Sequence, residues 1–118
     1  MVIIIIGILA AIAIPTYISQ RDKAYEAAIK SDLRNAAAAA TSCSVDNDGD
    51  YTGCGTIAGG VLSFPAPGYG YHQTTDVQMN TLVASPTRWA VNGTHTGLTG
   101  VTWHFDTNTG KVAPGAHP

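Results

Sequence analysis

The amino-terminal stretch of this chain, residues 1–15 with the sequence MVIIIIGILAAIAIP, constrains the fold more than any other feature. Residues 1–14 carry neither a charge nor a polar side chain. A helix of this length measures about 21 Å, and it falls short of the roughly 20 apolar residues that cross a bilayer core. Because large exposed apolar segments mark interfaces or membranes, we expect the stretch to be buried in lipid, in another chain, or in each at different times.

Three interpretations of this stretch compete. The Ala-Ile-Ala sequence at 11–13 fits the cleavage site of a secretory signal peptide, but no basic residues precede the apolar run. A plain membrane anchor agrees with the apolarity and disagrees with the length. A helix that packs against copies of itself is favoured by the small residues Gly7 and Ala10, together with the alanines of 11–13, because they let helix backbones approach closely.

The same stretch resembles a known family. Nine consecutive residues, followed by Tyr17, are similar to the N-terminal helix of type IV pilins and of the related type II secretion pseudopilins: Gly7, Ile8, Leu9, Ala10, Ala11, Ile12, Ala13, Ile14 and Pro15. Residues 32–37, 45–47 and 50–52 also resemble family segments near the end of the long helix. The family's processing site and its glutamate near the mature N-terminus would precede Met1, and neither is placed on this sequence.

The resemblance implies a function by assembly. The chain would be the major pilin of a type IV pilus, a helical filament of identical subunits on the cell surface, with the apolar helix held in the inner membrane before the pilus assembly machinery incorporates it. The resemblance also implies no enzymatic activity and no cofactor. Two alternatives remain, a pseudopilin of a type II secretion system and a membrane-anchored extracellular domain that does not assemble. Adhesion, motility, DNA uptake and electron transfer are not separated by the sequence.

Gly7 and Pro15 bound the weakest part of the predicted helix. Glycine lowers helix stability, and proline removes a helical hydrogen bond and crowds the preceding turn. The resemblance implies that residues 7–15 unwind when subunits pack into a filament.

Length and charge fit a small subunit that hides much of its surface. The 118 residues predict one globular domain, residues 16–118, behind the apolar segment 1–15. The formal net charge of −2 gives no general attraction to nucleic acid. Charged residues make up 12% of the chain, against roughly 25% in average soluble domains, which favours extensive contact with copies.

Residues 16–43 are predicted to continue the helix, and the fold class is α+β. Apolar residues recur at three- and four-residue spacing and form a stripe: Tyr25, Ile29, Leu33, Ala36, Ala37 and Ala40. The charged residues of the same segment form either a solvated face or contacts with neighbouring subunits: Arg21, Asp22, Lys23, Glu26, Lys30, Asp32 and Arg34.

The two cysteines, Cys43 and Cys54, flank the predicted end of the helix. Together with a membrane-directed N-terminus they indicate an oxidising compartment and a disulfide bond, although two free buried thiols remain the alternative. Such a bond would stabilise the fold by roughly 3 kcal/mol. The spacing does not fit a zinc or redox pair.

The segment 44–75 is predicted to be mainly loop, with residues 61–64 as a possible short strand. Its start, SVDNDGD at 44–50, has the alternating aspartates of a calcium loop. Counting from Asp46, however, the twelfth position is Ile57, where such a loop requires glutamate. A helix-ending turn is therefore preferred, and no metal site is expected.

The segment 76–113 is predicted to form a small antiparallel sheet whose apolar face covers the helix stripe. This prediction rests on alternating apolar and polar residues around 77–83, 89–95 and 101–106. A turn at 106–110 and a short strand at 111–113 complete the pattern. His104 and Asp106 are expected to form a solvent-facing pair rather than a catalytic one. Asn92-Gly93-Thr94 fits an N-glycosylation acceptor, and Asn-Gly is equally a turn signal. The sequence contains no G-x-S-x-G, P-loop or H-E-x-x-H motif.

Overall fold

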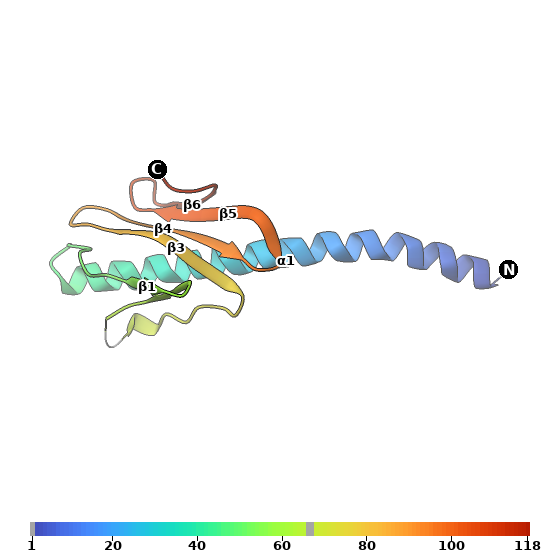
Figure 1. Ribbon diagram of the computed structural model, residues 1–118, viewed down its shortest axis with the longest axis horizontal. Helices are drawn as coiled ribbons and strands as arrows, with labels where there is room; N and C mark the ends of the chain where they lie inside the picture. Colours follow the sequence, from blue (N-terminus) through green and yellow to red (C-terminus); the bar gives the residue numbers. More distant parts are fainter. Residues whose placement is uncertain (1, 66–67) are drawn as a thin grey trace.

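The computed structural model describes the backbone of residues 2–65 and 68–118, and the side chains of these residues except 9–19 and 68. A single long helix is followed by short strands, in the order α1 (Val2–Asp46), β1 (Thr56–Ala58), β2 (Val61–Ser63), η1 (Gly68–Gly70), β3 (Val77–Ala84), β4 (Trp89–His95), β5 (Leu98–Asp106) and β6 (Lys111–Pro114). Figure 1 shows α1 running the length of the molecule, with all strands gathered along its carboxy-terminal half. The predicted α+β class, with a long N-terminal helix on antiparallel strands, is confirmed.

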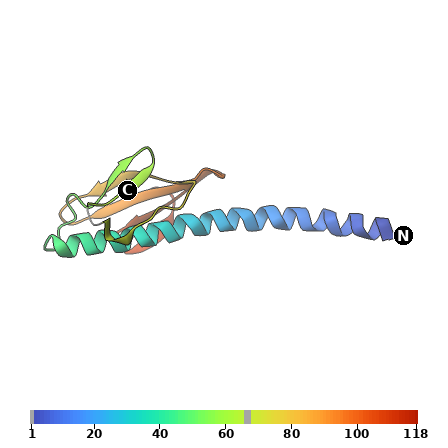
Figure 2. The ribbon, with the colours of Figure 1, turned by 90° about the horizontal axis from the view of Figure 1, so that it is seen from below.

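The strands form two antiparallel sheets on one side of α1 (Figure 2). The larger sheet has the order β3-β4-β5-β6, so that each strand pairs with its neighbour in sequence. Its extent agrees closely with the predicted sheet. The smaller sheet is the hairpin of β1 and β2, which lies inside the predicted loop, where only residues 61–64 were expected to form a strand. The hairpin turns at Gly59 and Gly60, whose φ angles of 59° and 80° suit glycine.

The core lies between α1 and the inner face of the larger sheet, as the two apolar patterns predict. The helix contributes Ile29 and Leu33, neither with measurable exposure, and the sheet contributes Met79, Trp89 and Val91. Alternate residues of β4 face α1 because side chains alternate across a strand. The predicted apolar stripe of α1 is therefore the surface on which the sheet packs.

Gly93 sets how closely helix and sheet approach. A Cβ atom at this position would lie 3.1 Å from Ile29 Cγ2 and 3.4 Å from both Leu33 Cδ2 and Met79 Sδ. The 3.1 Å contact is tighter than ordinary van der Waals packing and the other two are at its lower limit, so a glycine in the middle of β4 lets the helix sit against the backbone of the strand.

The opposite face of β4 is covered by the end of the chain. The backbone N–H of His117 donates to Asn92 Oδ1 at 2.9 Å, and the His117 ring contacts the carbonyl oxygen of Thr81. Asn92 is buried inside β4, paired with Asn80 on β3. The glycosylation pattern at 92–94 therefore lies in a buried strand, and the alternative interpretation of a turn there is wrong.

Candidate assembly helix and its anchorage

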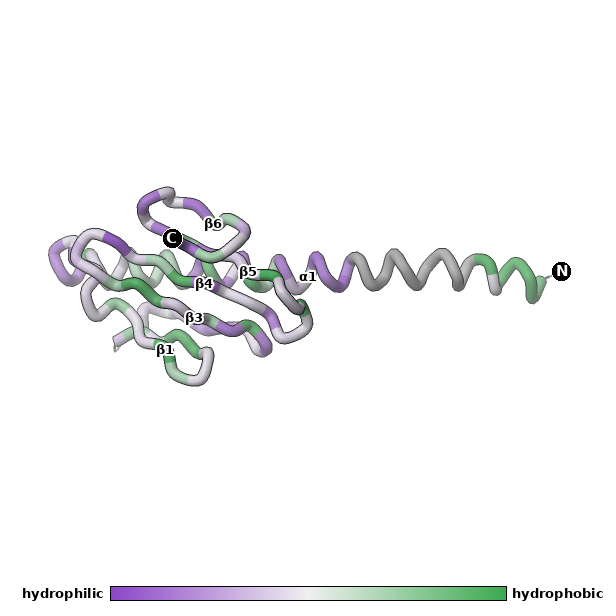
Figure 3. Tube along the Cα trace, turned by 45° about the horizontal axis from the view of Figure 1, so that its top comes forward, coloured by the Kyte–Doolittle hydropathy of each residue, from purple (hydrophilic) through white to green (hydrophobic). Residues whose placement is uncertain are grey.

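The amino-terminal end of α1 presents an apolar surface to solvent. The exposed fraction of its large side chains runs from 57% for Ile8 to 84% for Ile3, in the group Val2, Ile3, Ile4, Ile5, Ile6 and Ile8. Apart from the adjacent residues and the backbone of the same helical turns, no atom lies within 4 Å of where a Cβ atom on Gly7 would be. Figure 3 shows this hydrophobic end well away from the sheets. Such a surface is typical of a segment that another molecule covers.

The rest of the predicted assembly segment lies outside the described residues. This applies to Met1 and to the side chains of Leu9, Ala10, Ala11, Ile12, Ala13, Ile14 and Pro15. The helix is continuous from Val2 to Asp46 in the isolated chain, whereas the predicted break in residues 7–15 concerns packed subunits and stays a prediction. Among the described residues, none of the helices reaches the length and hydropathy required of a membrane span.

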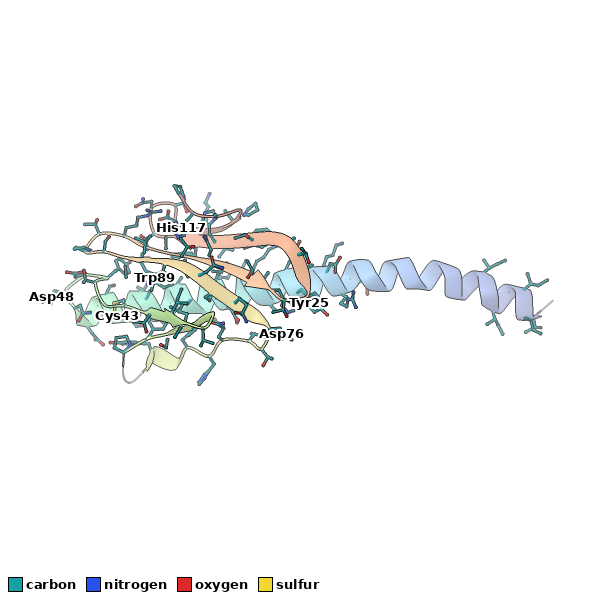
Figure 4. The ribbon with its side chains drawn as sticks, in the orientation of Figure 1. Tyr25, Cys43, Asp48, Asp76, Trp89 and His117 are labelled. Atoms are coloured by element: carbon teal, nitrogen blue, oxygen red, sulfur yellow. A yellow bond between two sulfur atoms is a disulfide. The ribbon has the colours of Figure 1, made fainter. Side chains whose placement is uncertain are left out.

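An aromatic stack anchors α1 where it meets the sheet. The rings of Tyr25 and His95 stack with centroids 4.1 Å apart, and Arg21 lies 5.9 Å from the centre of the Tyr25 ring. His95 Nδ1 accepts a 2.8 Å hydrogen bond from the N–H of Gly97. A Cβ atom at Gly97 would lie 2.6 Å from the Tyr25 ring, so the turn between β4 and β5 needs glycine to pack on the helix. Figure 4 shows Tyr25 and Asp76 together at this end of the sheet.

Asp32 forms a second anchor, and it corrects the prediction that the charges of residues 21–34 form a solvated or subunit-facing surface. It is 2% exposed. Its two carboxylate oxygens accept 2.7 Å hydrogen bonds from the backbone N–H and the hydroxyl of Thr74. Charged acceptors make stronger hydrogen bonds than neutral ones, so this contact ties α1 to the segment before β3. Burial, and secondarily the charge of Asp32, raises the pKa of the nearby Tyr71.

Lys30 departs from the solvated surface in another way. Its Nζ lies 4.1 Å from the centre of the Trp103 ring on β5, a cation–π contact. Strand alternation predicts that Trp103 lies on the apolar face of the sheet. In the structure a charged side chain of α1 lies over its ring.

The expected solvent-facing pair of His104 and Asp106 is wrong. The side chain of Asp106 is 3% exposed and pairs with Arg88, whose Nη2 lies 2.6 Å from Asp106 Oδ2 and whose Nε lies 3.2 Å from Oδ1. Oδ1 also accepts from the N–H of Asn108. The hydrogen bond from Arg88 and that from Asn108 outweigh the effect of burial and hold the pKa of Asp106 below its usual value. His104 instead places Nδ1 2.8 Å from the carbonyl oxygen of Gly115.

A disulfide bond between Cys43 and Cys54 closes the far end of α1, as predicted. Trp89 Nε1 donates a 2.6 Å hydrogen bond to the carbonyl oxygen of Cys54, so the loop that the disulfide bond closes is also held against β4. Figure 4 shows Cys43, Trp89 and the exposed Asp48 at this end of the molecule.

Two of the carboxylates in the acidic turn at 44–50 accept hydrogen bonds from protein donors. Asp46 Oδ2 accepts from the Tyr69 hydroxyl at 2.8 Å, which raises the pKa of Tyr69. Asp50 Oδ1 accepts from the N–H of Thr52 at 2.7 Å, and the hydrogen bonds from Thr52 lower the pKa of Asp50. Across the part of the chain that the structure describes, no three His, Cys, Asp or Glu residues come together as metal ligands.

Sequence reasoning missed the residues that connect distant segments. Asp32 and Thr74 lie 42 positions apart, and Arg88 and Asp106 lie 18 apart.

No protein-family model matches this chain, and comparisons with curated proteins and with solved structures likewise gave no match. The resemblance to pilins therefore depends on the sequence segments alone.

Proposed function

We propose that this chain is a structural subunit of a type IV pilus, assembled into a helical filament through the amino-terminal half of α1. The observation that carries the proposal is the apolar end of that helix, which exposes Ile3, Ile4 and four further aliphatic side chains. When a neighbouring subunit removes such aliphatic surface from water, the free energy of association becomes more favourable by about 25 cal/mol per Å² of apolar area buried.

The organisation of the chain supports the proposal. The core formed by Ile29, Leu33, Trp89 and the disulfide bond is complete without residues 2–8, which contribute nothing to the buried cluster. One end of α1 packs into the globular domain, and the other end leaves an apolar surface free. This arrangement suits a subunit that binds further copies of itself through the free end. In this proposal the helices bundle at the centre of the filament and the sheets coat it.

The same surface accounts for the state before assembly. An unassembled subunit keeps its apolar helix in the inner membrane, and the assembly machinery transfers it to the growing filament at the cell surface. The function is structural in this proposal, and no chemical reaction is assigned to the chain.

A matched pair of substitutions on α1 tests the proposal in the native cells. Ile4 and Val45 are both β-branched, with 66% and 70% of their surface exposed, and they lie at opposite ends of the helix. Ile4→Asp should abolish surface filaments seen by electron microscopy, because a buried carboxylate without a partner is strongly unfavourable in an apolar bundle. Val45→Asp should leave the filaments in place.

Immunogold labelling of the filaments, with an antibody against the globular domain, identifies their subunit. Unlabelled filaments, or filaments that persist in the Ile4→Asp strain, would contradict the proposal. Filaments confined beneath the outer surface would favour a pseudopilin instead. A protein that stays dispersed in the membrane fraction would favour the anchored domain that does not assemble.

A further inference from the structure

A groove of about 460 Å³ lies beside the hairpin, between β2 and the segment that leads into β3. We call it the hairpin groove; residues 61–64 form one wall and residues 71–78 form the other. It lies on the globular domain, away from the apolar end of α1, and the proposed assembly surface does not use it. A hollow of this size is within the range of small-ligand sites.

The groove is preformed because one glutamine joins its walls. Gln73 Oε1 accepts from the Leu62 N–H at 2.9 Å and from the Tyr71 hydroxyl at 3.2 Å. Gln73 Nε2 donates to the carbonyl oxygens of Gly60 at 2.8 Å and Val77 at 2.7 Å. Four hydrogen bonds from one side chain fix the hairpin relative to the opposite wall, so little ordering is required when a ligand enters.

The Asp32 anchor holds the second wall from behind. Thr74 donates both its N–H and its hydroxyl to the buried carboxylate of Asp32 on α1. The groove is therefore attached to the long helix α1, and a site supported by regular secondary structure keeps its geometry better than one on a free loop.

The backbone edge of the hairpin is not free to add a strand. The Leu62 N–H is taken by Gln73, and the carbonyl oxygen of Gly60 accepts from both Gln73 Nε2 and the N–H of Met79 at 2.8 Å. Recognition of an extended peptide by strand addition depends on such main-chain groups. A ligand of this groove must instead be recognised by side chains.

Those side chains combine apolar surface with hydrogen-bonding groups. Val61 is 52% exposed and Tyr71 is half-buried, while His72 and Thr75 are exposed and Gln78 is half-buried. A Cβ atom at Gly60 would lie 1.7 Å from Gln78 Oε1, so the glycine gives the Gln78 amide its place beside the hairpin. The described residues that line the groove include one carboxylate, that of Asp76, and neither lysine nor arginine.

From this arrangement we propose that the hairpin groove binds a neutral oligosaccharide. The aliphatic and aromatic wall suits the C–H faces of a sugar ring, and the amide, hydroxyl, imidazole and carboxylate groups suit its hydroxyls. A phosphate or a sialic acid would meet the Asp76 carboxylate without a lysine or arginine to pair with. A lipid chain would leave the polar side chains without partners.

The test uses the full chain in dodecylphosphocholine micelles, because detergents with sugar head groups would compete for the groove. A printed array of neutral and sialylated oligosaccharides is the first probe, and saturation-transfer NMR with the strongest neutral oligosaccharide is the second. Gln78→Ala and His72→Ala remove groups from the groove. Gln20→Ala is the matched control, because Gln20 is an exposed glutamine on α1 outside the groove.

The wild-type chain should bind neutral oligosaccharides. Gln78→Ala should weaken binding about three- to tenfold, the loss expected for one neutral hydrogen bond, and Gln20→Ala should leave it unchanged. The proposal is overturned if no neutral oligosaccharide binds, if only sialylated ones bind, or if both groove variants bind as tightly as the wild type. Circular dichroism checks the fold of each variant, and His72→Ala decides if Gln78→Ala does not fold. The apolar end of α1 is intact in every variant, so loss of binding is separable from failure of assembly.

Discussion

Replacing Asp106 by asparagine should lower the free energy of unfolding by about 2–3 kcal/mol at pH 7. The substitution keeps the size of the side chain and the oxygen that accepts from Asn108, and it removes the charge that Arg88 approaches at 2.6 Å and 3.2 Å. Hydrogen bonds to charged groups contribute about 1.5–3 kcal/mol, against about 0.5–1.5 for neutral ones. The change stays below the roughly 3–5 kcal/mol of a fully buried broken pair, because the Arg88 side chain remains 23% exposed.

The pH dependence of this difference follows from the lowered pKa of Asp106. The folded state holds the Asp106 proton less tightly than the unfolded state, whose pKa is near the ordinary value of 3.8. The ion pair therefore stabilises the fold fully above that value, and the contribution disappears as the pH falls through the lower, folded-state pKa. The Asp106→Asn variant lacks this contribution at every pH. The free energies of unfolding of the two proteins should therefore become equal in strong acid.

Urea unfolding followed by tryptophan fluorescence measures this effect, since Trp89 is buried in the native core. Asp76→Asn is the matched control, because Asp76 is an exposed aspartate whose loss should change stability by less than about 0.5 kcal/mol. A difference between wild type and Asp106→Asn that is the same at pH 7 and at pH 2 would refute the reasoning, because it would show that the charge is not what stabilises the fold.

Three further perturbations have defined outcomes. The Cys43→Ser, Cys54→Ser double variant should lose roughly 3 kcal/mol of stability in urea, the entropy gained by opening a short loop, and an unchanged midpoint would exclude a stabilising role for the bond. Gly93→Val should lower the thermal midpoint even though valine favours strands, because overpacking against the helix costs about 1–3 kcal/mol. A midpoint equal to that of the wild type would show that the helix can move to accommodate the side chain without loss of stability. Replacing Gly7 and Pro15 by alanine should impair filament assembly more than it impairs folding, and a filament with unbroken helical hydrogen bonding through residues 7–15 would contradict the proposed unwinding.

The parts of the fold that follow from short-range pattern could be predicted. The spacing of Ile29, Leu33 and the alanines that follow depends only on the helical period, and alternation in residues 101–106 depends only on the strand period. The disulfide bond could be predicted because the chain has two cysteines, Cys43 and Cys54. Each of these inferences uses information within one segment, or uses two cysteines that allow a single pairing within the chain.

The remaining features depend on pairs that the sequence does not single out. Asp32 resembles the other charged residues of its segment, and only the fold brings Thr74 to it from 42 positions away. Asp106 follows the strand alternation that predicts exposure, yet Arg88 reaches it from the turn before β4. The hairpin groove has no sequence signature, because the glutamine that joins its walls is one of several polar residues in a glycine-rich stretch.

The alignment of α1 with the sheet determines how the domain responds to mechanical load. A pull on the amino-terminal end of α1 acts along the line of contact with the sheet, from the Tyr25 stack to the disulfide bond (Figure 1). The anchors at Tyr25, Asp32 and the core below Gly93 are then strained together in shear, rather than separated one after another as in peeling. Beyond them, Cys43 is joined covalently to Cys54, whose carbonyl oxygen accepts the indole hydrogen of Trp89. The helix therefore cannot slide past its last turn without drawing Cys54 with it, which breaks the hydrogen bond to Trp89 and moves the segment that follows Cys54.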